Sequence, residues 1–343
     1  MREIAAGLRD WRAGGRRFAL ATVVATRGSA PRPAGTAMAI SADGAVLGSV
    51  SGGCVEAALH EIATEVLRTG RPARCHFGID AGDLAPVGLM CGGEIEVYVD
   101  PVAPATGSVI DEVVDGVLGG RSVTLRTRLV EDIASTPTIG APVDTEDVAL
   151  EVDPDGVPVL VQSFVAPARM IVFGAIDIAD AVARAGRFLG YRVTVCDPRP
   201  VFATPERFPH ADEVVVDWPH RYLAGQRVDA SSVLCVLTHD AKVDLPLLEV
   251  ALRGDAGYVG VMGSRQTQDI RIARLRERGL SAAELARLRG PIGLDLGART
   301  PAETAISIAA EIVAWRHGRS GRPLSQTDVP IHDVPMAALV CGA

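Results

Sequence analysis

The sequence predicts an α/β chain in which an N-terminal mixed α+β domain is followed by a Rossmann-like, mostly parallel, doubly wound domain. From Arg169 onward, short apolar strands alternate with amphipathic helices, which is typical of a parallel sheet with helices on both faces. Before residue 130, strand candidates are joined by turns and loops as well as by helices, which is typical of a mixed domain. The length of 343 residues also favours two domains.

Charge and composition argue against several classes of protein. The formal net charge is −8 and the isoelectric point about 5.4, whereas a nucleic-acid surface needs a basic face, so we expect no nucleic-acid partner. The sequence shows no run of 18 apolar residues and no secretory leader pattern, so we expect no membrane span and a cytoplasmic location. The six scattered cysteines are expected to be reduced thiols rather than a disulfide framework.

Changes in composition divide the chain into four expected segments. Residues 1–130 form the mixed α+β domain, which carries both Cys54 and Cys91. Residues 131–168 are rich in Pro, Asp and Thr, and we expect a linker with one or two strands. Residues 169–318 form the Rossmann-like domain, and residues 319–343 form a loosely held tail.

Short local signals predict individual turns and helix ends. Asp43-Gly44 lies between two apolar runs within residues 36–50, which predicts a β-hairpin. The pairs Ser281 with Glu284 and Thr300 with Glu303 have the spacing of capping boxes, which predicts two helix N-termini.

The stretch Gly52-Gly53-Cys54 joins an apolar strand to an amphipathic helix that the sequence places from Cys54 onward. The two glycines allow backbone angles that a side chain would forbid, so a ligand can approach closely. A thiol at a helix N-terminus has a lowered pKa and is a better nucleophile or metal ligand. A structural turn followed by a small buried cysteine is an equally open interpretation.

A second stretch, Cys91-Gly92-Gly93, repeats the combination of one cysteine with two glycines. Two such stretches within forty residues suggest that Cys54 and Cys91 share a pocket. Neither is accompanied by a C-x-x-C pair or a His pair, so the pattern does not indicate zinc.

The loop from Arg27 to Gly35 contains two prolines and several basic or hydroxyl side chains. Arg27, Ser29 and Arg32 together have the chemistry to hold an anion. A solvated basic loop without a ligand is the alternative, and the local sequence favours it.

The second domain begins with a damaged dinucleotide fingerprint. An apolar strand runs into Gly174, and Asp197 follows 23 residues later at the end of the next strand, as in a dinucleotide-binding βαβ unit. Ile176 stands where a glycine normally lets the backbone approach pyrophosphate, and Asp177 adds a negative charge there. The fold prediction survives this change, but NAD(P) binding is not expected.

Polar residues follow two later strands of the same domain. His239 and Asp240 end one strand, and strand ends of an open parallel sheet face the ligand crevice. Ser264 and Arg265 begin the helix after the next strand and offer a hydroxyl and a guanidinium to an anion. An Asp cap beside an exposed His is the structural alternative for the first pair.

Several stretches together resemble the xanthine dehydrogenase accessory protein family of the XdhC/CoxI type. The resemblance covers residues 1–317, and the number and order of the matching stretches make it specific. These stretches are ATVVATRGSAPRPAGTAMAI, GSVSGGCVEAAL, GLMCGGEIEVYVDP, VLTHDAKVDLPLLEVAL, YVGVMGSRQTQDIR and GPIGLDLGARTPAETAISIAAEIVA. The glycine turn departs from the family, which often has a fuller Gly-x-Gly pattern where this chain has Ile176.

The resemblance implies a chaperone that binds molybdenum cofactor, assists its sulfuration and inserts it into xanthine dehydrogenase or a related molybdenum hydroxylase. Cys54 matches the cysteine that the family is thought to use to hold the cofactor, so it is the expected metal ligand. The expected cofactor-binding residues are Cys54, Gly52, Gly53, Arg27, Arg32, Cys91, Gly174, Asp197, His239, Ser264 and Arg265.

The resemblance also implies partners. The cofactor is molybdopterin or its dinucleotide form, a cysteine desulfurase donates the sulfur, and the chain forms a homodimer. We expect an accessory factor rather than an enzyme and assign no catalytic residue. Two alternatives stay open: an NAD(P)-dependent oxidoreductase, against which Ile176 counts, and a non-catalytic assembly scaffold with a degenerate nucleotide site.

Overall fold

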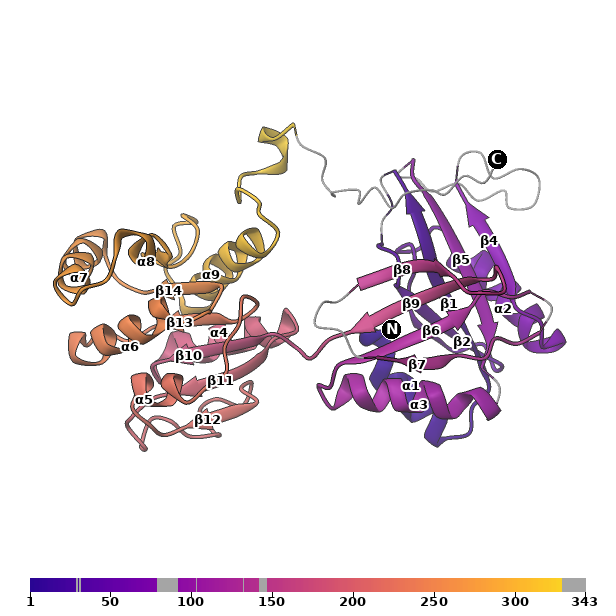
Figure 1. Cartoon of the computed structure of the whole chain (residues 1–343), viewed down its shortest axis with the longest axis horizontal. Helices are drawn as coiled ribbons and strands as arrows, with labels where there is room; N and C mark the ends of the chain where they lie inside the picture. Colours follow the sequence, from indigo (N-terminus) through magenta and orange to yellow (C-terminus); the bar gives the residue numbers. More distant parts are fainter. Residues whose placement is uncertain are drawn as a thin grey trace. The chain divides into compact units, whose positions relative to one another are not determined.

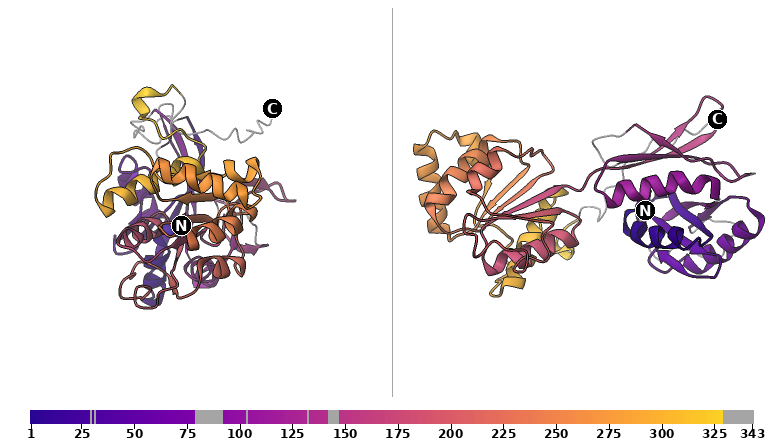
Figure 2. Two further views of the ribbon diagram at one scale, coloured as in Figure 1. Left: turned by 90° about the vertical axis from the view of Figure 1, so that its left-hand side faces the viewer. Right: turned by 90° about the horizontal axis from the view of Figure 1, so that it is seen from below.

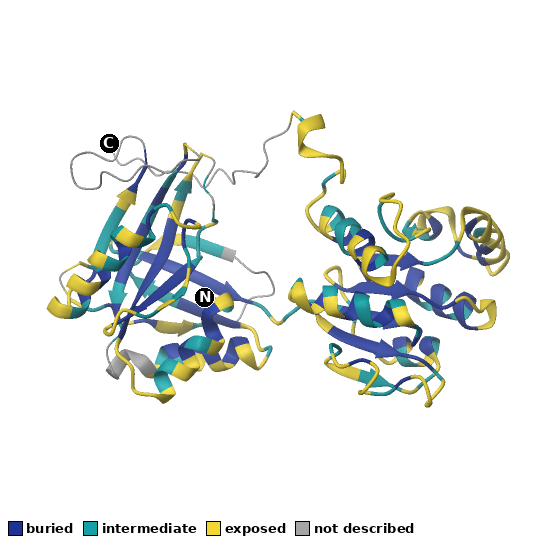
Figure 3. Cartoon of the chain, turned by 180° about the vertical axis from the view of Figure 1, so that it is seen from behind, coloured by how far each residue is buried: buried dark blue, intermediate teal, exposed yellow. Residues whose placement is uncertain are grey.

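The computed structural model describes residues 1–28, 30, 32–78, 92–102, 104–131, 133–141 and 147–328. The described chain forms two compact units that divide between Ala166 and Pro167. Each unit has its own sheet or sheets and its own apolar core, and Figure 3 shows the central strands of both units as buried. The units are therefore described one at a time.

The first unit is organised around a five-stranded antiparallel sheet, sheet A (Figure 1). The strand order is β3-β2-β1-β5-β4, and the predicted hairpin at Asp43-Gly44 joins β2 to β3. Helix α2 (Glu56–Thr69) packs on one face of the sheet through Leu59, Ala63 and Val66. The strands are β1 (Phe18–Arg27), β2 (Ala37–Ser41), β3 (Val46–Gly48), β4 (Ala73–Phe77) and β5 (Glu94–Pro101).

A second antiparallel sheet, sheet B, lies in the same unit and has the order β7-β6-β9-β8. Three of its strands come from the segment that the sequence predicts to be a linker with one or two strands. That segment pairs with β6 because its strands bury Val159, Leu160 and Phe164 and find a full ladder of backbone partners there. The strands are β6 (Val123–Arg128), β7 (Thr138–Gly140), β8 (Asp147–Val152) and β9 (Pro158–Phe164).

Two helices close the first unit on the side away from α2. Helix α1 (Ala5–Ala13), preceded by the short 3-10 helix η1 (Arg2–Ile4), lies beside α3 (Pro104–Leu118), as Figures 1 and 2 show. Ile4 from η1 and Leu8 from α1 pack with Ile110 and Val113 from α3 in one core cluster.

The second unit has the predicted Rossmann-like fold. Its six strands are all parallel in the order β12-β11-β10-β13-β14-β15. Successive strands are added on one side of β10 as far as β12 and on its other side from β13, so the strand order reverses between β10 and β13. Crevices at such a reversal, beyond the carboxyl ends of the strands, are where this fold binds ligands. The strands are β10 (Arg169–Phe173), β11 (Arg192–Cys196), β12 (Glu213–Val215), β13 (Val233–Val236), β14 (Tyr258–Val261) and β15 (Leu288–Arg289).

Helices cover both faces of this sheet, which is why its strands are apolar on both sides (Figure 2). One face carries α4 (Asp177–Phe188) and α9 (Pro301–Arg316). The other carries α5 (Pro219–Ala224), α6 (Ala241–Arg253), α7 (Arg265–Glu277) and α8 (Ala282–Ala286). Both predicted capping boxes are confirmed, at Ser281 and at Thr300.

After α9 the described chain contains one short 3-10 helix, η2 (Leu324–Gln326). The remainder of the expected tail, from residue 329 onward, lies outside the described residues. Within the described ranges, no helix combines the length and the apolar character that crossing a bilayer requires.

Candidate functional site

Three connections of the first unit leave sheet A at the same end, which we name the loop end. Strand β1 finishes there at Arg27, opposite Glu94 at the start of β5. Strand β4 finishes at Phe77, opposite Ile95, and β3 finishes at Gly48 beside the start of β2. The antiparallel ladders thus bring the ends of β1, β3 and β4 and the start of β5 to one end of the sheet (Figure 1).

The Cys54 loop differs from the sequence prediction in where the helix begins. Helix α2 starts at Glu56 with Val55 as its N-cap residue, so Cys54 lies two residues before the helix rather than opening it. Gly52 and Gly53 have φ angles of 78° and 122°, which other residues rarely adopt, as predicted from the glycine pair. Cys54 is half-buried against the core beneath α2 and stays a free thiol.

The Glu56 carboxylate is the centre of this loop. Its Oε1 accepts hydrogen bonds from Ser49 Oγ at 2.5 Å, from Val50 N–H at 3.2 Å and from Ser51 N–H at 2.9 Å. Its Oε2 accepts from Ser51 Oγ at 2.5 Å, Gly53 N–H at 2.9 Å and Val55 N–H at 3.2 Å. The carboxylate therefore holds the whole turn between β3 and α2.

These contacts keep Glu56 ionised. Burial by itself would raise the pKa of this carboxyl, but the hydrogen bonds from Ser49, Ser51 and the backbone outweigh it and lower the pKa to about 2. The remaining loop amides also have internal acceptors, because Gly52 N–H donates to Ser49 Oγ at 2.8 Å and Cys54 N–H donates to Ser51 Oγ at 3.0 Å.

The amides of Gly52, Gly53 and Cys54 are therefore not free to bind an external anion. The chain fills this anion site with its own carboxylate, two residues beyond Cys54. What the loop presents is a half-buried thiol on a turn whose backbone is hydrogen-bonded internally. Apart from their chain neighbours, no described residue lies within 4 Å of the Cβ positions of Gly52 and Gly53.

The two arginines of the neighbouring loop differ in how far they are engaged. The Arg27 side chain is 65% exposed, and its nearest carboxylate, Glu94, lies 3.8 Å away. Arg32 donates to Glu3 at 3.1 Å, so its charge is already paired. Gly28 approaches Gly93, since a Cβ there would lie 3.5 Å from the Gly93 Cα. Arg27 is thus the more available cation at the loop end, while Ser29 and Cys91 lie outside the described residues.

In the second unit, Gly174 directly follows β10, at the point where the strand order reverses. Its φ is 110°, and a Cβ there would come within 2.8 Å of the Thr238 side chain after β13. Ile176 is the N-cap residue of α4 and offers no side-chain hydrogen bond to the helix. Asp177, in the first turn, is 3.7 Å from Arg207.

Asp197 has the predicted position at the end of β11 but faces its own chain. Its Oδ2 accepts from Ala175 N–H at 2.8 Å, and the Arg199 side chain donates to both carboxylate oxygens at 2.9 Å. Burial would raise the pKa of Asp197, but the bonds from Arg199 and Ala175 outweigh it and lower the pKa. Its side chain is 1% exposed, so the carboxylate is not open to ribose hydroxyls.

The other expected residues of this crevice begin helices. Asp240 caps α6 by accepting from Lys242 N–H at 2.9 Å, and His239 beside it is exposed, as the structural alternative anticipated. Ser264 caps α7 by accepting from Thr267 N–H at 3.0 Å, and its Oγ also lies 2.8 Å from Thr267 Oγ1. Arg265 is exposed at the start of the same helix.

Comparison with known proteins places these features in one family. Residues 11–78 match the XdhC and CoxI family, and residues 170–312 match the XdhC Rossmann domain. The chain belongs to the XdhC and CoxI family. The predicted resemblance is therefore confirmed in both units.

Relatives of this XdhC and CoxI family chain include two from Escherichia coli. It is 28% identical to the molybdenum cofactor insertion chaperone PaoD over 302 residues, which cover 88% of this chain and 84% of PaoD. It is 25% identical to the uncharacterized protein YqeB over 307 residues, which cover 89% of this chain but only 44% of YqeB. The chain thus spans less than half the length of that second relative.

Two Bacillus proteins extend the comparison. The chain is 26% identical over 317 residues to a Bacillus subtilis protein named as a probable xanthine dehydrogenase subunit, covering 87% of this chain and 92% of that protein. A crystal structure from Bacillus halodurans, described as a xanthine dehydrogenase, superposes with a TM-score of 0.74 at 24% identity, covering 94% of this chain and 98% of that one. The Bacillus halodurans protein and this chain therefore have the same fold.

A buried polar network of the XdhC Rossmann domain escaped the sequence analysis. Arg271 donates to Asp244 at 3.2 Å, to Met262 O at 3.1 Å and to Gln268 at 2.9 Å, and Thr238 donates to Asp244. Burial raises the pKa of Asp244, and its bonds to Thr238 and Arg271 oppose that rise. The signal in the sequence was an acid on the apolar face of one helix and an Arg three residues after a Gln on the next.

Among the described residues, no group of three or more His, Cys, Asp and Glu side chains lies close enough together to hold a metal ion. Cys54 is the soft donor at the described part of the loop end, and thiolates are ligands for soft metal centres. In the described part of the loop end, the groups that could contact a ligand are the Cys54 thiol and the Arg27 guanidinium.

Proposed function

We propose that this chain is a molybdenum cofactor chaperone that binds the cofactor, assists its sulfuration and inserts it into a molybdenum hydroxylase. The support is membership of the XdhC and CoxI family together with a relative, named as a molybdenum cofactor insertion chaperone, that aligns over most of both chains. Such a chaperone also needs a side chain that can hold the cofactor.

The observation that carries the proposal is the placement of Cys54. Its thiol stands on an internally bonded turn at the loop end of sheet A, where no described residue packs against the Cβ positions of Gly52 and Gly53. A soft sulfur ligand in an accessible position fits a molybdenum centre bound as cargo. Arg27, largely exposed at the same end, has the charge to contact the phosphate of the pterin.

The two units have different roles in this proposal. The Cys54 thiol and Arg27 of the first unit make the main contacts, and Cys91, which lies outside the described residues, is a weaker contributor by sequence alone. In the second unit, Arg265 and the first turn of α7 stay candidates for phosphate contact, whereas Asp197 is engaged internally. The cofactor is either molybdopterin or its dinucleotide form.

The proposal includes partners. The client is a xanthine dehydrogenase or a related molybdenum hydroxylase, because one relative is named as a probable component of a xanthine dehydrogenase. A cysteine desulfurase as sulfur donor, a homodimeric assembly and a cytoplasmic location are predictions from the sequence resemblance.

The alternatives have less support. An NAD(P)-dependent oxidoreductase needs an acid that is free for ribose and an open glycine turn, whereas Asp197 already accepts from Ala175 and Arg199. A non-catalytic scaffold with a degenerate nucleotide site agrees with this closed turn, but it gives no reason for an accessible thiol at the loop end.

The test compares two half-buried cysteines of the first unit. Cys54→Ala should keep the fold but lose molybdenum and pterin from protein purified under anoxic conditions with its cofactor supply. Cys75→Ala is the matched control, since burial and the nearby Glu131 raise the pKa of Cys75 to about 11, which keeps it a thiol. Equal molybdenum content in the parent and Cys54→Ala would remove Cys54 from the site.

A further inference from the structure

Glu56 has an unusual position for a residue that begins a helix. Its carboxylate turns back over the preceding loop and accepts from five residues between Ser49 and Val55, with contacts of 2.5–3.2 Å. Two of the donors are hydroxyls and four are backbone amides, and they divide equally between the two carboxylate oxygens. Cys54 lies between two of the amide donors, Gly53 and Val55.

The loop needs such an anchor because its own sequence does not restrict it. Glycine loses more conformational freedom on ordering than any other residue, and no described neighbour packs against the Cβ positions of Gly52 and Gly53. Val50 and Val55 are fully buried and fix the two ends of the loop. Between these ends, the described contacts that set the backbone are those of Glu56 and of the Ser49 and Ser51 hydroxyls.

The chemistry of the contacts requires a carboxylate of this length. Each oxygen receives three donors, so a Gln at this position can satisfy one oxygen's set but points an NH₂ group at the other. The Ser51 oxygen already accepts from the amides of Cys54 and Val55, and the amides of Gly53 and Val55 cannot accept at all, so this NH₂ group finds no acceptor there. An Asp side chain is one methylene shorter and cannot keep both sets.

We propose that Glu56 is a positioning residue that fixes the Gly52-Gly53-Cys54 backbone and thereby sets where the Cys54 thiol stands. Its importance for the cofactor rests on the proposed function, but its effect on the loop is a property of the chain alone. The carboxylate replaces an external anion in the loop, so the turn holds the thiol in place without a bound ligand.

The first experiment uses the full-length protein without cofactor. Glu56→Gln is compared with Glu61→Gln, an exposed acid on the same helix, by peptide-resolved hydrogen exchange and by the rate of Cys54 alkylation with iodoacetamide. We expect amide exchange in residues 50–55 to accelerate at least about tenfold in Glu56→Gln, a factor that corresponds to about 1.4 kcal/mol, with faster alkylation of Cys54. Exchange in residues 60–69 should stay as in the parent, and Glu61→Gln should change neither measurement.

A milder variant guards against loss of folding. Ser51→Ala removes one hydroxyl that bridges Glu56 to the amides of Cys54 and Val55, so it should shift both measurements in the same direction by a smaller factor. Parent-like exchange and alkylation in both Glu56→Gln and Ser51→Ala would overturn the proposal. Acceleration spread over all of α2 would also overturn it, because Glu56 would then stabilise the helix rather than the loop.

The second experiment connects the loop to the cofactor. We expect Glu56→Gln purified with cofactor to retain several-fold less molybdenum than Glu61→Gln, an effect of the order of 1 kcal/mol. Full retention by a variant whose loop exchanges rapidly would overturn the link between loop order and cofactor binding. Retention by Cys54→Ala would instead contradict the proposed function and leave the exchange result standing, so the two failures are distinguishable.

Discussion

The backbone N–H of Ala175 donates to the carboxylate of Asp197 at 2.8 Å, so the acid at the end of β11 is bonded to the glycine turn after β10. In a dinucleotide-binding domain, the acid at this position holds the ribose hydroxyls and the turn approaches pyrophosphate. In this chain the acid and the turn are hydrogen-bonded to each other instead. Arg199 completes the closure by donating to both carboxylate oxygens from a position stacked on Phe202.

This closure predicts weak binding of nicotinamide dinucleotides. Isothermal titration calorimetry with NADH should give no dissociation constant tighter than about 1 mM, equivalent to about −4 kcal/mol. Arg199→Ala frees part of the Asp197 carboxylate, but the Ile176 side chain remains at the turn, so binding by this variant should stay weak as well. Micromolar binding by the parent would contradict the prediction and favour the oxidoreductase alternative.

The buried pair of Asp244 and Arg271 predicts a large stability effect in the second unit. Arg271→Ala leaves the Asp244 carboxylate buried without its cation, and removal of one partner from a buried pair costs about 3–5 kcal/mol. The measurement is the free energy of unfolding in urea, followed by fluorescence in a Trp11→Phe background so that Trp218 and Trp315 report this unit.

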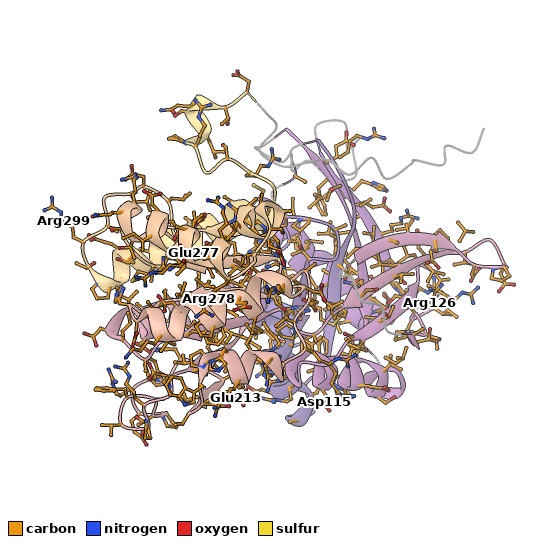
Figure 4. The ribbon with its side chains drawn as sticks, turned by 60° about the vertical axis from the view of Figure 1, so that its left-hand side comes forward. Asp115, Arg126, Glu213, Glu277, Arg278 and Arg299 are labelled. Carbon is orange, nitrogen blue, oxygen red and sulfur yellow. The ribbon has the colours of Figure 1, made fainter. Side chains whose placement is uncertain are left out.

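Arg278→Ala is the matched control for that prediction. Arg278, labelled in Figure 4, pairs with Glu249 at 3.3 Å on the surface, where an ion pair is worth less than about 1 kcal/mol. Similar losses of unfolding free energy for Arg271→Ala and Arg278→Ala would show that the buried pair contributes no more to stability than the surface pair.

The capping box of α9 predicts a smaller effect. Thr300 accepts from Glu303 N–H at 3.2 Å, and Glu303 accepts from the amides of Arg299 and Thr300 at 2.8 and 2.9 Å. The Arg299 side chain itself extends from the exposed loop before the helix (Figure 4). Thr300→Ala should lower the free energy of unfolding by about 1 kcal/mol in the same urea assay.

Thr304→Ala tests whether that loss comes from the cap. Thr304 donates its hydroxyl to Thr300 O inside the first turns of the helix, and Ala has the higher helix propensity. This variant should therefore be neutral or slightly stabilising. A loss equal to that of Thr300→Ala would mean that any threonine removed here costs the same, whatever its role.

Local signals in the sequence were sufficient for much of the fold. The repeated pattern of apolar strand, turn and helix after Arg169 predicted the parallel sheet, because each strand must be apolar on both faces. Asp43-Gly44 and the two capping boxes predicted their turn and helix ends because those motifs act within a few residues.

Elements that depend on distant partners were not predicted. Helix α3 was missed because Val109, Ile110, Val113, Val114 and Val117 are β-branched residues, and packing against α1 decides in favour of a helix. One or two strands were expected in residues 131–168, but their pairing into sheet B was not, since β6 pairs with β9 across the proline-rich segment between them. A polar, proline-rich composition gave no sign of this ladder.

The candidate site was likewise predicted only in part. The glycine pair and Cys54 were visible in the sequence, but the start of α2 was placed two residues early. A carboxylate that caps the loop from beyond the N-cap residue follows no standard capping pattern, so Glu56 received no role. Asp197 was found by its spacing, yet its bond to Ala175 could be learned only from the structure.

Ionisation of Glu56 predicts how the stability of the first unit depends on pH. The folded-state pKa of about 2 lies below the ordinary value of 4.5, so the carboxylate contributes stability above about pH 4.5 and loses it as the pH falls toward 2. Glu56→Gln has no such proton to gain. The parent should therefore be more stable than Glu56→Gln at pH 6, and the difference should shrink between pH 4.5 and 2.

The measurement is urea unfolding at several pH values in a Trp218→Phe, Trp315→Phe background, where Trp11 reports the first unit. Glu65→Gln serves as the control, because Glu65 is exposed on α2 and its carboxylate bonds to Arg68 alone among the described contacts. Its difference from the parent should be small at every pH. A Glu56→Gln difference that stays constant from pH 6 to pH 2.5 would show that the six hydrogen bonds to this carboxylate do not depend on its charge, and the turn would then be held by its buried ends, Val50 and Val55.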